Sequence, residues 1–273
     1  MAKQWHARNG AAEQDAAPGG WIAEIKSAFA SVLLPADCRI CERLLVRASR
    51  IPICEECIAS FKEVLGRICE VCGAPLFALS NEESDAALCP ACQSRTYSFE
   101  RARSYGVYEG ALTRAILLLK FERMEPLGAY FAEKLVGLAR EGGEAFGADL
   151  VVPVPLHAER RRERGYNQAE LIARPLAKKL RIPFVPMLVR TRPRPDKRVL
   201  SLEERWESVR GAFATRTGSQ VDKRRVLLLD DVLTTGATLD ACTRVLGQAG
   251  AKSVVGLTVA RAVRYPVRGS GNG

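Results

Sequence analysis

The sequence contains no hydrophobic run long enough to cross a bilayer. A membrane helix needs about 18 consecutive apolar residues, and no apolar stretch among these 273 residues approaches that length. The first 20 residues are polar and lack the apolar core that a secretory signal requires. We therefore expect a cytoplasmic protein without a membrane span.

Two features that nucleotide- and nucleic-acid-binding proteins use are missing or rare. No Gly-Lys-Ser/Thr sequence follows a glycine-rich loop, which excludes a Walker-type nucleotide site. Aromatic residues make up only 7% of the chain, and just two of them, Phe61 and Phe77, lie among the cysteine motifs described below. The cysteine region therefore offers few aromatic side chains on which nucleic-acid bases could stack.

Charge is the main departure from an average composition. The formal net charge is +10 and the pI is about 9.3. This balance favours anionic partners, either phosphorylated substrates, nucleic acid or both. A basic pI also fits a soluble protein with no nucleic-acid role. The length suits one large domain or two modest ones.

Eight of the nine cysteines form four C-x-x-C pairs, which indicates metal binding in a reducing compartment rather than disulfides. Zinc is the default ion for such sites, and a sulfur-ligated iron site is the alternative. We expect two structural sites with sequential pairing, although spacing alone leaves a cross-braced arrangement open. The ligands would be Cys38, Cys41, Cys54 and Cys57 for one ion, and Cys69, Cys72, Cys89 and Cys92 for the other. A closed four-cysteine shell leaves no open position for catalysis, so this block is a structural or docking module.

The most informative stretch runs from Val226 to Leu239. An apolar run, Val226–Leu229, predicts a strand buried on both faces that ends near two carboxylates. The hydroxyl-rich segment Thr234–Thr238 follows, and apolar residues at helical spacing come after it. The segment would therefore lie at a helix N-terminus and at the carboxyl end of a strand, which is where open α/β sheets bind anionic ligands.

Hydrophobic periodicity predicts further elements and an arginine-rich site. The predicted elements are an amphipathic helix over 21–34, strands over 101–108, 149–154 and 252–260, and helices over 111–121, 127–140 and 168–180. Pro175 predicts a kink in the last of these helices or a helix that starts there. Four arginines, Arg160, Arg161, Arg162 and Arg164, form a candidate polyanion site, and a solvated basic loop is the alternative.

The order of these motifs resembles that of the ComF/GntX-like family of phosphoribosyltransferase-related proteins. The shared features are the C-x-x-C pairs, Val-Pro-Val-Pro at 152–155, Arg-Gly-Tyr-Asn-Gln at 164–168, and the apolar run, two acids and Thr-Thr-Gly-Ala-Thr after it. The resemblance covers roughly residues 21–262. It implies an α/β fold of the type I phosphoribosyltransferases, a Rossmann-like parallel sheet with flanking helices, preceded by a small double zinc ribbon.

The resemblance also implies roles for individual residues. Asp230 and Asp231 would hold the ribose hydroxyls of phosphoribosyl pyrophosphate (PRPP) and assist catalysis, with Mg²⁺ bridging ribose and pyrophosphate. The 5′-phosphate would bind at Thr234, Thr235, Gly236, Ala237 and Thr238, and the pyrophosphate at Pro155, Leu156, His157, Arg164 and Arg198. Residues 188–213 would form a hood over the site, but Arg194, Lys197 and Ser208 depart from the family's pattern there.

The expected domains are a disordered leader over 1–20, the amphipathic helix and double zinc ribbon over 21–96, the phosphoribosyltransferase domain over 97–262 and a flexible tail over 263–273. The implied activity is transfer of phosphoribosyl from PRPP to an unidentified acceptor, in DNA uptake by competent cells. The alternative is a non-catalytic sensor of PRPP or a nucleotide. In that role the chain would handle single-stranded DNA and dock a competence or DNA-processing protein through its ribbons. The oligomeric state is left open.

Overall fold

The computed structural model describes residues 37–45, 49–76, 88–141, 146–193, 201–219 and 221–263. The expected leader over 1–20, the expected helix over 21–34, the tail from 264 onward and Arg198 of the hood lie outside these ranges. Contacts divide the chain into two compact units, Met1–Cys54 and Glu55–Gly273. In the part of the chain that the structure describes, no helix is long and apolar enough to cross a membrane.

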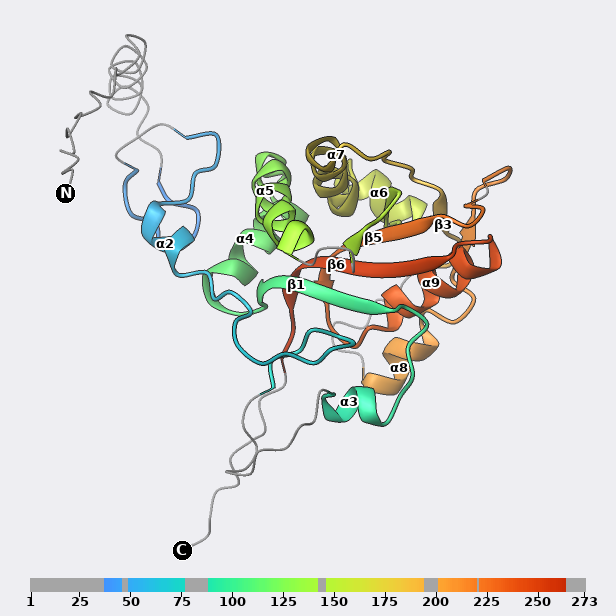
Figure 1. Ribbon diagram of the computed structural model, residues 1–273. Coiled ribbons are helices and arrows are strands. Elements are labelled where there is room, and N and C mark those ends of the chain that lie inside the picture. The colour runs from blue at the N-terminus through green and yellow to red at the C-terminus, as the bar shows by residue number, and fades with distance from the viewer. Residues whose placement is uncertain are drawn as a thin grey trace, which may run out of the picture. The chain divides into compact units, whose positions relative to one another are not determined.

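A four-stranded parallel sheet forms the centre of the larger unit (Figure 1). Its strands, in the order β1-β6-β5-β2, are β1 (Arg101–Val107), β6 (Ser253–Arg261), β5 (Arg225–Leu233) and β2 (Leu150–Pro153). Inner strands that are covered on both faces carry nearly continuous apolar side chains. All four side chains of Val226–Leu229 are fully buried. The structure therefore confirms the buried strand that the apolar run predicts.

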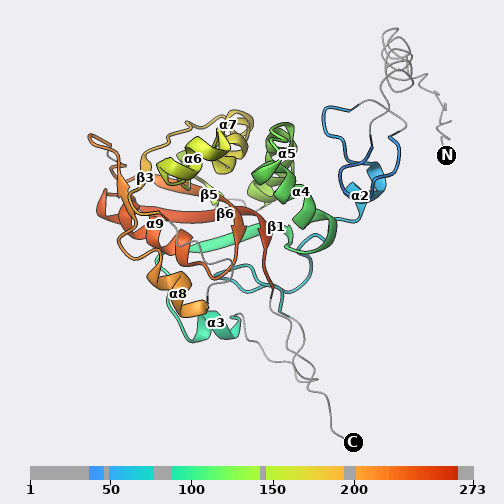
Figure 2. The same cartoon turned by 180° about the vertical axis from the view of Figure 1, so that it is seen from behind.

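Helices cover both faces of this sheet, as two opposite views show (Figures 1 and 2). One face carries α4 (Gly110–Phe121), α5 (Pro126–Glu141), α6 (Ala158–Arg164) and α7 (Gln168–Leu180), and the other carries α8 (Leu202–Glu207) and α9 (Ala237–Gln248). The cysteine segments add the short helices α2 (Glu55–Ala59) and α3 (Pro90–Gln93). Outside the main sheet, β3 (Leu188–Arg190) pairs antiparallel with β4 (Phe213–Thr215). The doubly covered parallel sheet confirms the expected fold class.

Helix α7 runs without interruption through Pro175, so it neither starts there nor stops there. Proline removes the hydrogen bond that its nitrogen would otherwise donate to the carbonyl of Leu171. That carbonyl faces α5 at Gly128, where an added Cβ would lie 2.8 Å from the Leu171 oxygen. Because Gly128 has no side chain, α5 can pack closely against α7 at the turn that Pro175 weakens.

One local expectation was wrong. Strand β5 does not end at the carboxylates but continues to Leu233, because β6 extends far enough to pair Asp230 with Thr258 and Val232 with Ala260. The basic stretch, for which a solvated loop was the alternative interpretation, is a helix: α6 contains Arg160, Arg161, Arg162 and Arg164, and none of its residues is buried.

Candidate ligand site and metal centres

The loop after β5 requires a glycine at position 236, because of both its backbone conformation and its close packing. This residue has a φ of +83°, in the left-handed region that favours glycine. A Cβ there would also lie 2.6 Å from the Cε1 atom of Tyr97. Helix α9 begins at the next residue, Ala237, whose backbone N–H donates to Thr235 Oγ1 at 3.3 Å. The hydroxyl-rich segment therefore lies at the N-terminus of a three-turn helix, a favourable place for a phosphate.

The two carboxylates occupy different environments. Asp231 is 5% exposed, whereas Asp230 is half-buried. Asp230 Oδ1 accepts a hydrogen bond from the backbone N–H of Asp231 at 2.8 Å. Burial, together with the charge of Asp231, raises the pKa of Asp230 to about 7. Asp230 therefore titrates near neutral pH.

Two cations lie near Asp231. Lys120 Nζ, from the last turn of α4, is 2.8 Å from Asp231 Oδ2. Burial lowers the pKa of Arg164, and the charge of Asp231 opposes that shift. The Arg164 guanidinium lies 5.0 Å from the centre of the Phe121 ring. The sequence analysis selected Arg164 but missed Lys120, whose one visible signal is a lone lysine after three leucines.

The predicted pyrophosphate turn follows β2, which pairs in parallel with β5. The carboxyl ends of both strands therefore meet at one edge of the sheet, and the turn shares that edge with the carboxylates. Pro155 has no N–H group, so only Leu156 and His157 of this turn can offer backbone amides. Among the described residues, His157 Nδ1 has no hydrogen-bond partner, and Glu159 Oε2, 3.8 Å away, is too distant to orient it as a general base requires.

The described part of the hood contacts the hydroxyl-rich segment Thr234–Thr238, the predicted phosphate loop. Helix α8 begins with a capping box, in which Ser201 Oγ accepts from the Glu204 N–H at 3.1 Å and Glu204 Oε2 accepts from the Ser201 N–H at 2.8 Å. One turn later, Arg205 Nη1 donates to Thr234 Oγ1 at 3.3 Å. The hood thus supplies a guanidinium next to the predicted phosphate position.

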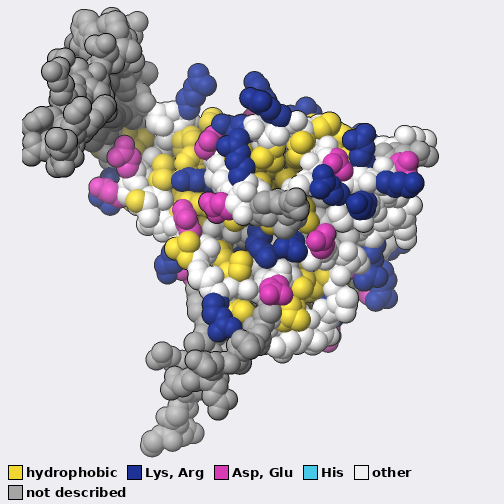
Figure 3. All heavy atoms as spheres, in the orientation of Figure 1, with side chains coloured by type: hydrophobic (Ala, Val, Ile, Leu, Met, Phe, Trp, Pro, Cys, Tyr) yellow, Lys and Arg dark blue, Asp and Glu magenta, His cyan; other side chains and the backbone are white. Residues whose placement is uncertain are grey.

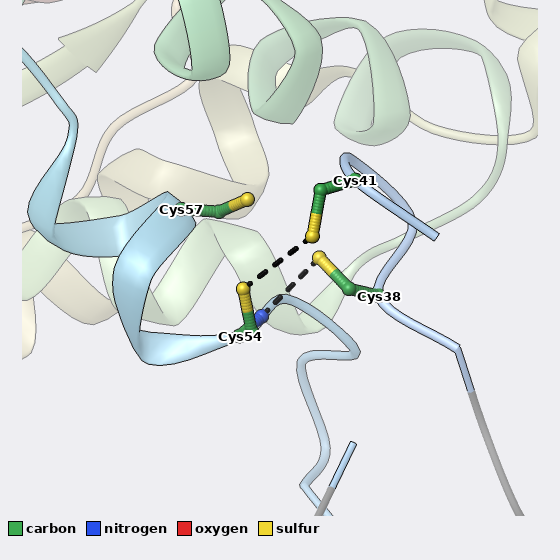
Figure 4. A group of neighbouring side chains, drawn as sticks. All are labelled: Cys38, Cys41, Cys54 and Cys57. Carbon is green, nitrogen blue, oxygen red and sulfur yellow. Dashed lines mark hydrogen bonds between the residues drawn. The ribbon is translucent and has the colours of Figure 1, made fainter. Parts of the chain in front are cut away.

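The eight paired cysteines form two clusters, and within each cluster the sulfur atoms lie within 4.8 Å of one another. The pairing is sequential rather than cross-braced: Cys38, Cys41, Cys54 and Cys57 form the first cluster, and Cys69, Cys72, Cys89 and Cys92 form the second. Figure 4 shows the sulfur atoms of the first cluster facing a common space. A Zn–S bond of about 2.3 Å places tetrahedral ligands about 3.8 Å apart. The Cys41–Cys54 and Cys72–Cys89 sulfur distances of 3.7 and 3.5 Å fit Zn²⁺.

The second cluster reaches the phosphate loop through two residues that the sequence analysis missed. The Tyr97 hydroxyl donates to the Thr235 carbonyl at 2.9 Å. Burial raises the pKa of Tyr97 to about 12, which keeps this donor protonated at neutral pH. Arg261 is 6% exposed and donates both to the Thr234 carbonyl and to Cys72 Sγ. An arginine that ends a strand with no other charged residue is the signal that could have drawn attention to it.

Two family models match the chain. Residues 29–93 match the double zinc ribbon domain, and residues 167–265 match the phosphoribosyl transferase domain. The chain carries a double zinc ribbon and a phosphoribosyl transferase domain. The double zinc ribbon includes both cysteine clusters, and the phosphoribosyl transferase domain includes the carboxylates and the phosphate loop.

Curated relatives match most of the chain. Competence protein F from Haemophilus influenzae is 29% identical over 77% of this chain and 89% of its own length. DNA utilization protein YhgH from Escherichia coli K12 is 27% identical over 81% of this chain and 95% of its own. Competence protein ComFC from Bacillus subtilis is 27% identical over 77% of this chain and 84% of its own length. These similarities confirm the resemblance to the ComF-like phosphoribosyltransferase family.

Solved structures overlap with part of the chain. The glutamine PRPP amidotransferase from B. subtilis is 26% identical with a TM-score of 0.31, over 46% of this chain and 26% of its own. An adenine phosphoribosyltransferase is 18% identical with a TM-score of 0.33, over 48% of this chain and 69% of its own. TM-scores this low support no inference about function.

Proposed function

We propose that the chain binds PRPP with Mg²⁺ and transfers its phosphoribosyl group to an acceptor. The observation that carries this proposal is the arrangement at the end of β5. Two carboxylates precede a hydroxyl-rich loop at the N-terminus of α9, and all of them lie in the segment that matches the phosphoribosyl transferase domain. Carboxylates suit ribose hydroxyls and the helix N-terminus suits the 5′-phosphate.

The proposed reaction is a displacement at the anomeric carbon of PRPP. The acceptor's lone pair forms a bond to that carbon, while the bond to the pyrophosphate oxygen breaks and pyrophosphate leaves with the electron pair. Asp230 and Asp231 orient the ribose and place negative charge near the carbon that becomes cationic. Lys120 fixes the Asp231 carboxylate through their ion pair. When bound, Mg²⁺ offsets the charge of the leaving pyrophosphate.

The hood and the turn after β2 complete the proposed site. Arg205 lies next to the phosphate loop, and Arg164 lies near Asp231. Both guanidiniums suit phosphate oxygens because their paired N–H groups match that geometry. The backbone amides of Leu156 and His157 lie at the same sheet edge and would receive the pyrophosphate.

The names of the relatives, competence and DNA utilization, support a cellular role in handling DNA. The net charge of +10 agrees with an anionic partner. On the face shown in Figure 3, however, the Lys and Arg side chains are dispersed among acidic ones and do not form one basic patch. We therefore assign the DNA-related role to the biological process and not to a located DNA-binding surface.

A sensor that binds PRPP or a nucleotide without turnover is the second candidate. It is favoured by His157, whose Nδ1 has no hydrogen-bond partner in the described part of the chain and lies 3.8 Å from Glu159 Oε2, beyond the reach that a catalytic base needs. The sensor predicts PRPP binding with no pyrophosphate release for any acceptor. An enzyme predicts pyrophosphate release that depends on the acceptor supplied.

Calorimetry with PRPP, with and without Mg²⁺, tests the shared part of both candidates. We expect Mg²⁺-dependent binding by the wild type, weakened at least roughly tenfold in Asp230→Asn/Asp231→Asn because the ribose loses two charged acceptors. Asp222→Asn is the matched control, because this exposed carboxylate lies before β5 at the opposite edge of the sheet. If a folded, zinc-loaded wild type binds no PRPP, both candidates are wrong.

A further inference from the structure

We propose that the second cysteine cluster and the phosphate loop form one coupled unit, in which Arg261 and Tyr97 are positioning residues. Metal bound by Cys69, Cys72, Cys89 and Cys92 would then determine how well the loop is placed to bind phosphate. This inference deepens the proposed function and rests on it for the identity of the ligand.

Arg261 is the first link. It ends β6, is 6% exposed, and donates from Nη1 to the carbonyls of Leu233 and Thr234 and from Nη2 to Cys72 Sγ at 3.6 Å. One planar guanidinium therefore joins a metal ligand to the first residue of the phosphate loop. The geometry needs an arginine, since the single ammonium of lysine cannot span both partners in the same way.

The charge of Arg261 makes this link dependent on the metal. A buried cation is costly without a counter-charge, and among the described residues no carboxylate forms an ion pair with Arg261. A divalent ion with four thiolates carries a net charge of about −2, so the metal-loaded cluster supplies the missing counter-charge. Hydrogen bonds from outside groups to metal-bound ligands commonly fix a metal site, and here the same guanidinium also holds the loop through its other nitrogen.

Tyr97 is the second link, and it follows the last ligand of the cluster by five residues. Its ring packs against the cluster and against Gly236, and its hydroxyl donates to the Thr235 carbonyl at 2.9 Å. The next residue, Ser98, donates its backbone N–H to Asp240 Oδ1 in α9 at 2.6 Å. The segment that leaves the cluster thus contacts the loop, its glycine and the helix behind it.

The cluster itself is fixed on the sheet. The carbonyl of Val71, between the ligands Cys69 and Cys72, accepts from the Ala102 N–H of β1 at 2.7 Å. Gly73 packs so closely on β1 that an added Cβ would lie 2.7 Å from the Ala102 carbonyl. The cluster therefore has a defined position from which Arg261 and Tyr97 can hold the loop.

The test compares Arg261→Lys with Arg103→Lys, in the full chain with both zinc ions bound. Arg103 donates to the Glu70 and Ala102 carbonyls, so it contacts the second ribbon without touching the loop. Two measurements are made on each variant and on the wild type. One is hydrogen exchange of the peptide containing Thr234–Thr238 without ligand. The other is the rate of zinc release to a chelator with and without ribose 5-phosphate.

We expect faster exchange of the loop in Arg261→Lys at unchanged zinc content, and wild-type exchange in Arg103→Lys. Ribose 5-phosphate would bind the loop that the zinc-loaded cluster holds in place and so stabilise the loaded state. It should therefore slow release of one zinc ion by roughly fivefold or more in the wild type and in Arg103→Lys, but not in Arg261→Lys. Unchanged loop exchange in Arg261→Lys would overturn the coupling. Ligand-independent zinc release from a wild type that binds ribose 5-phosphate would do so as well. A protected loop that depends on Arg261 but binds no ribose 5-phosphate would uphold the coupling and reject the proposed function.

Discussion

The two cysteine clusters have the same ligands and similar sulfur distances, yet their surroundings differ. In the first cluster Cys41 and Cys54 are partly exposed, and Cys38 Sγ accepts from the Cys54 N–H at 3.3 Å, a bond within the same ribbon. In the second cluster all four cysteines are buried, and Cys72 accepts from Arg261 of the phosphoribosyl transferase domain. Clusters with the same four ligands can therefore differ in role: the first holds its own ribbon together, and the second also contacts the predicted phosphate loop through Arg261.

The largest expected effect comes from removing one ligand of each cluster. Cys72→Ser and Cys41→Ser should each lose one zinc ion, but only Cys72→Ser should weaken ribose 5-phosphate binding, by roughly a hundredfold, because the loop loses its fixed support. Zinc content and calorimetry measure both quantities on the same samples. Equal weakening by the two substitutions would remove the distinction between the clusters.

Lys120→Met should cost about 2–4 kcal/mol of the free energy of unfolding, because it leaves the carboxylate of Asp231 buried without its ion-pair partner. Lys62→Met is the matched control. Lys62 pairs with Glu109 but its side chain is 71% exposed, so its removal should cost less than about 1 kcal/mol. Urea denaturation measures both, and similar losses would show that Asp231 is not held as described.

Gly236→Ala should destabilise the protein by about 2 kcal/mol and weaken phosphate binding, since alanine disfavours the left-handed backbone and would press on Tyr97. Gly247→Ala lies in the same helix with nothing within 4 Å of the added Cβ. It should stabilise the protein by about 0.5 kcal/mol, because alanine is the better helix former. Thermal unfolding and calorimetry distinguish these outcomes, and a neutral Gly236→Ala would argue against the Tyr97 contact.

The smallest effect concerns pH and Asp230. Its folded pKa of about 7 lies above the usual value of about 3.9, so between these values the folded state binds a proton that the unfolded state releases. Stability therefore falls as pH rises through this window, and the penalty is complete above it. The groups that act on Asp230 are Asp231, Lys120 and Cys242.

Asp230→Asn should remove that dependence, so its stability advantage over the wild type should grow as pH rises from 5 to 8. Asp222→Asn, at an exposed position, should follow the wild type. Denaturant midpoints across this range provide the measurement. If the two variants share one pH profile, Asp230 does not titrate near neutrality.

Local patterns in the sequence predicted the elements well. The helix over 168–180 has the expected bounds, and the buried run at Val226–Leu229 is an inner parallel strand. Both elements depend on residues that are close in the sequence, such as a helix-capping residue, apolar residues at helical spacing or a continuous apolar run. The extension of β5 through Asp230 was missed because it depends on how far β6 continues beside it.

The site was predictable only where one motif contains it. The carboxylates and the phosphate loop are contiguous, so the sequence displays them together. The bond between Arg261 and Cys72 joins residues 189 positions apart, and that between Tyr97 and Thr235 joins residues 138 positions apart. No spacing in one sequence encodes such contacts, because they arise only when the second ribbon packs on the sheet.

The most direct test of the account is phosphorus-31 NMR of PRPP and Mg²⁺ with the zinc-loaded full chain. We predict that the 5′-phosphate resonance shifts or broadens on addition of the wild type and much less on addition of Gly236→Ala, since the loop from Thr234 to Thr238 is the proposed phosphate site. If every phosphorus resonance is unchanged by a folded wild type, the end of β5 does not bind PRPP, and the account is contradicted.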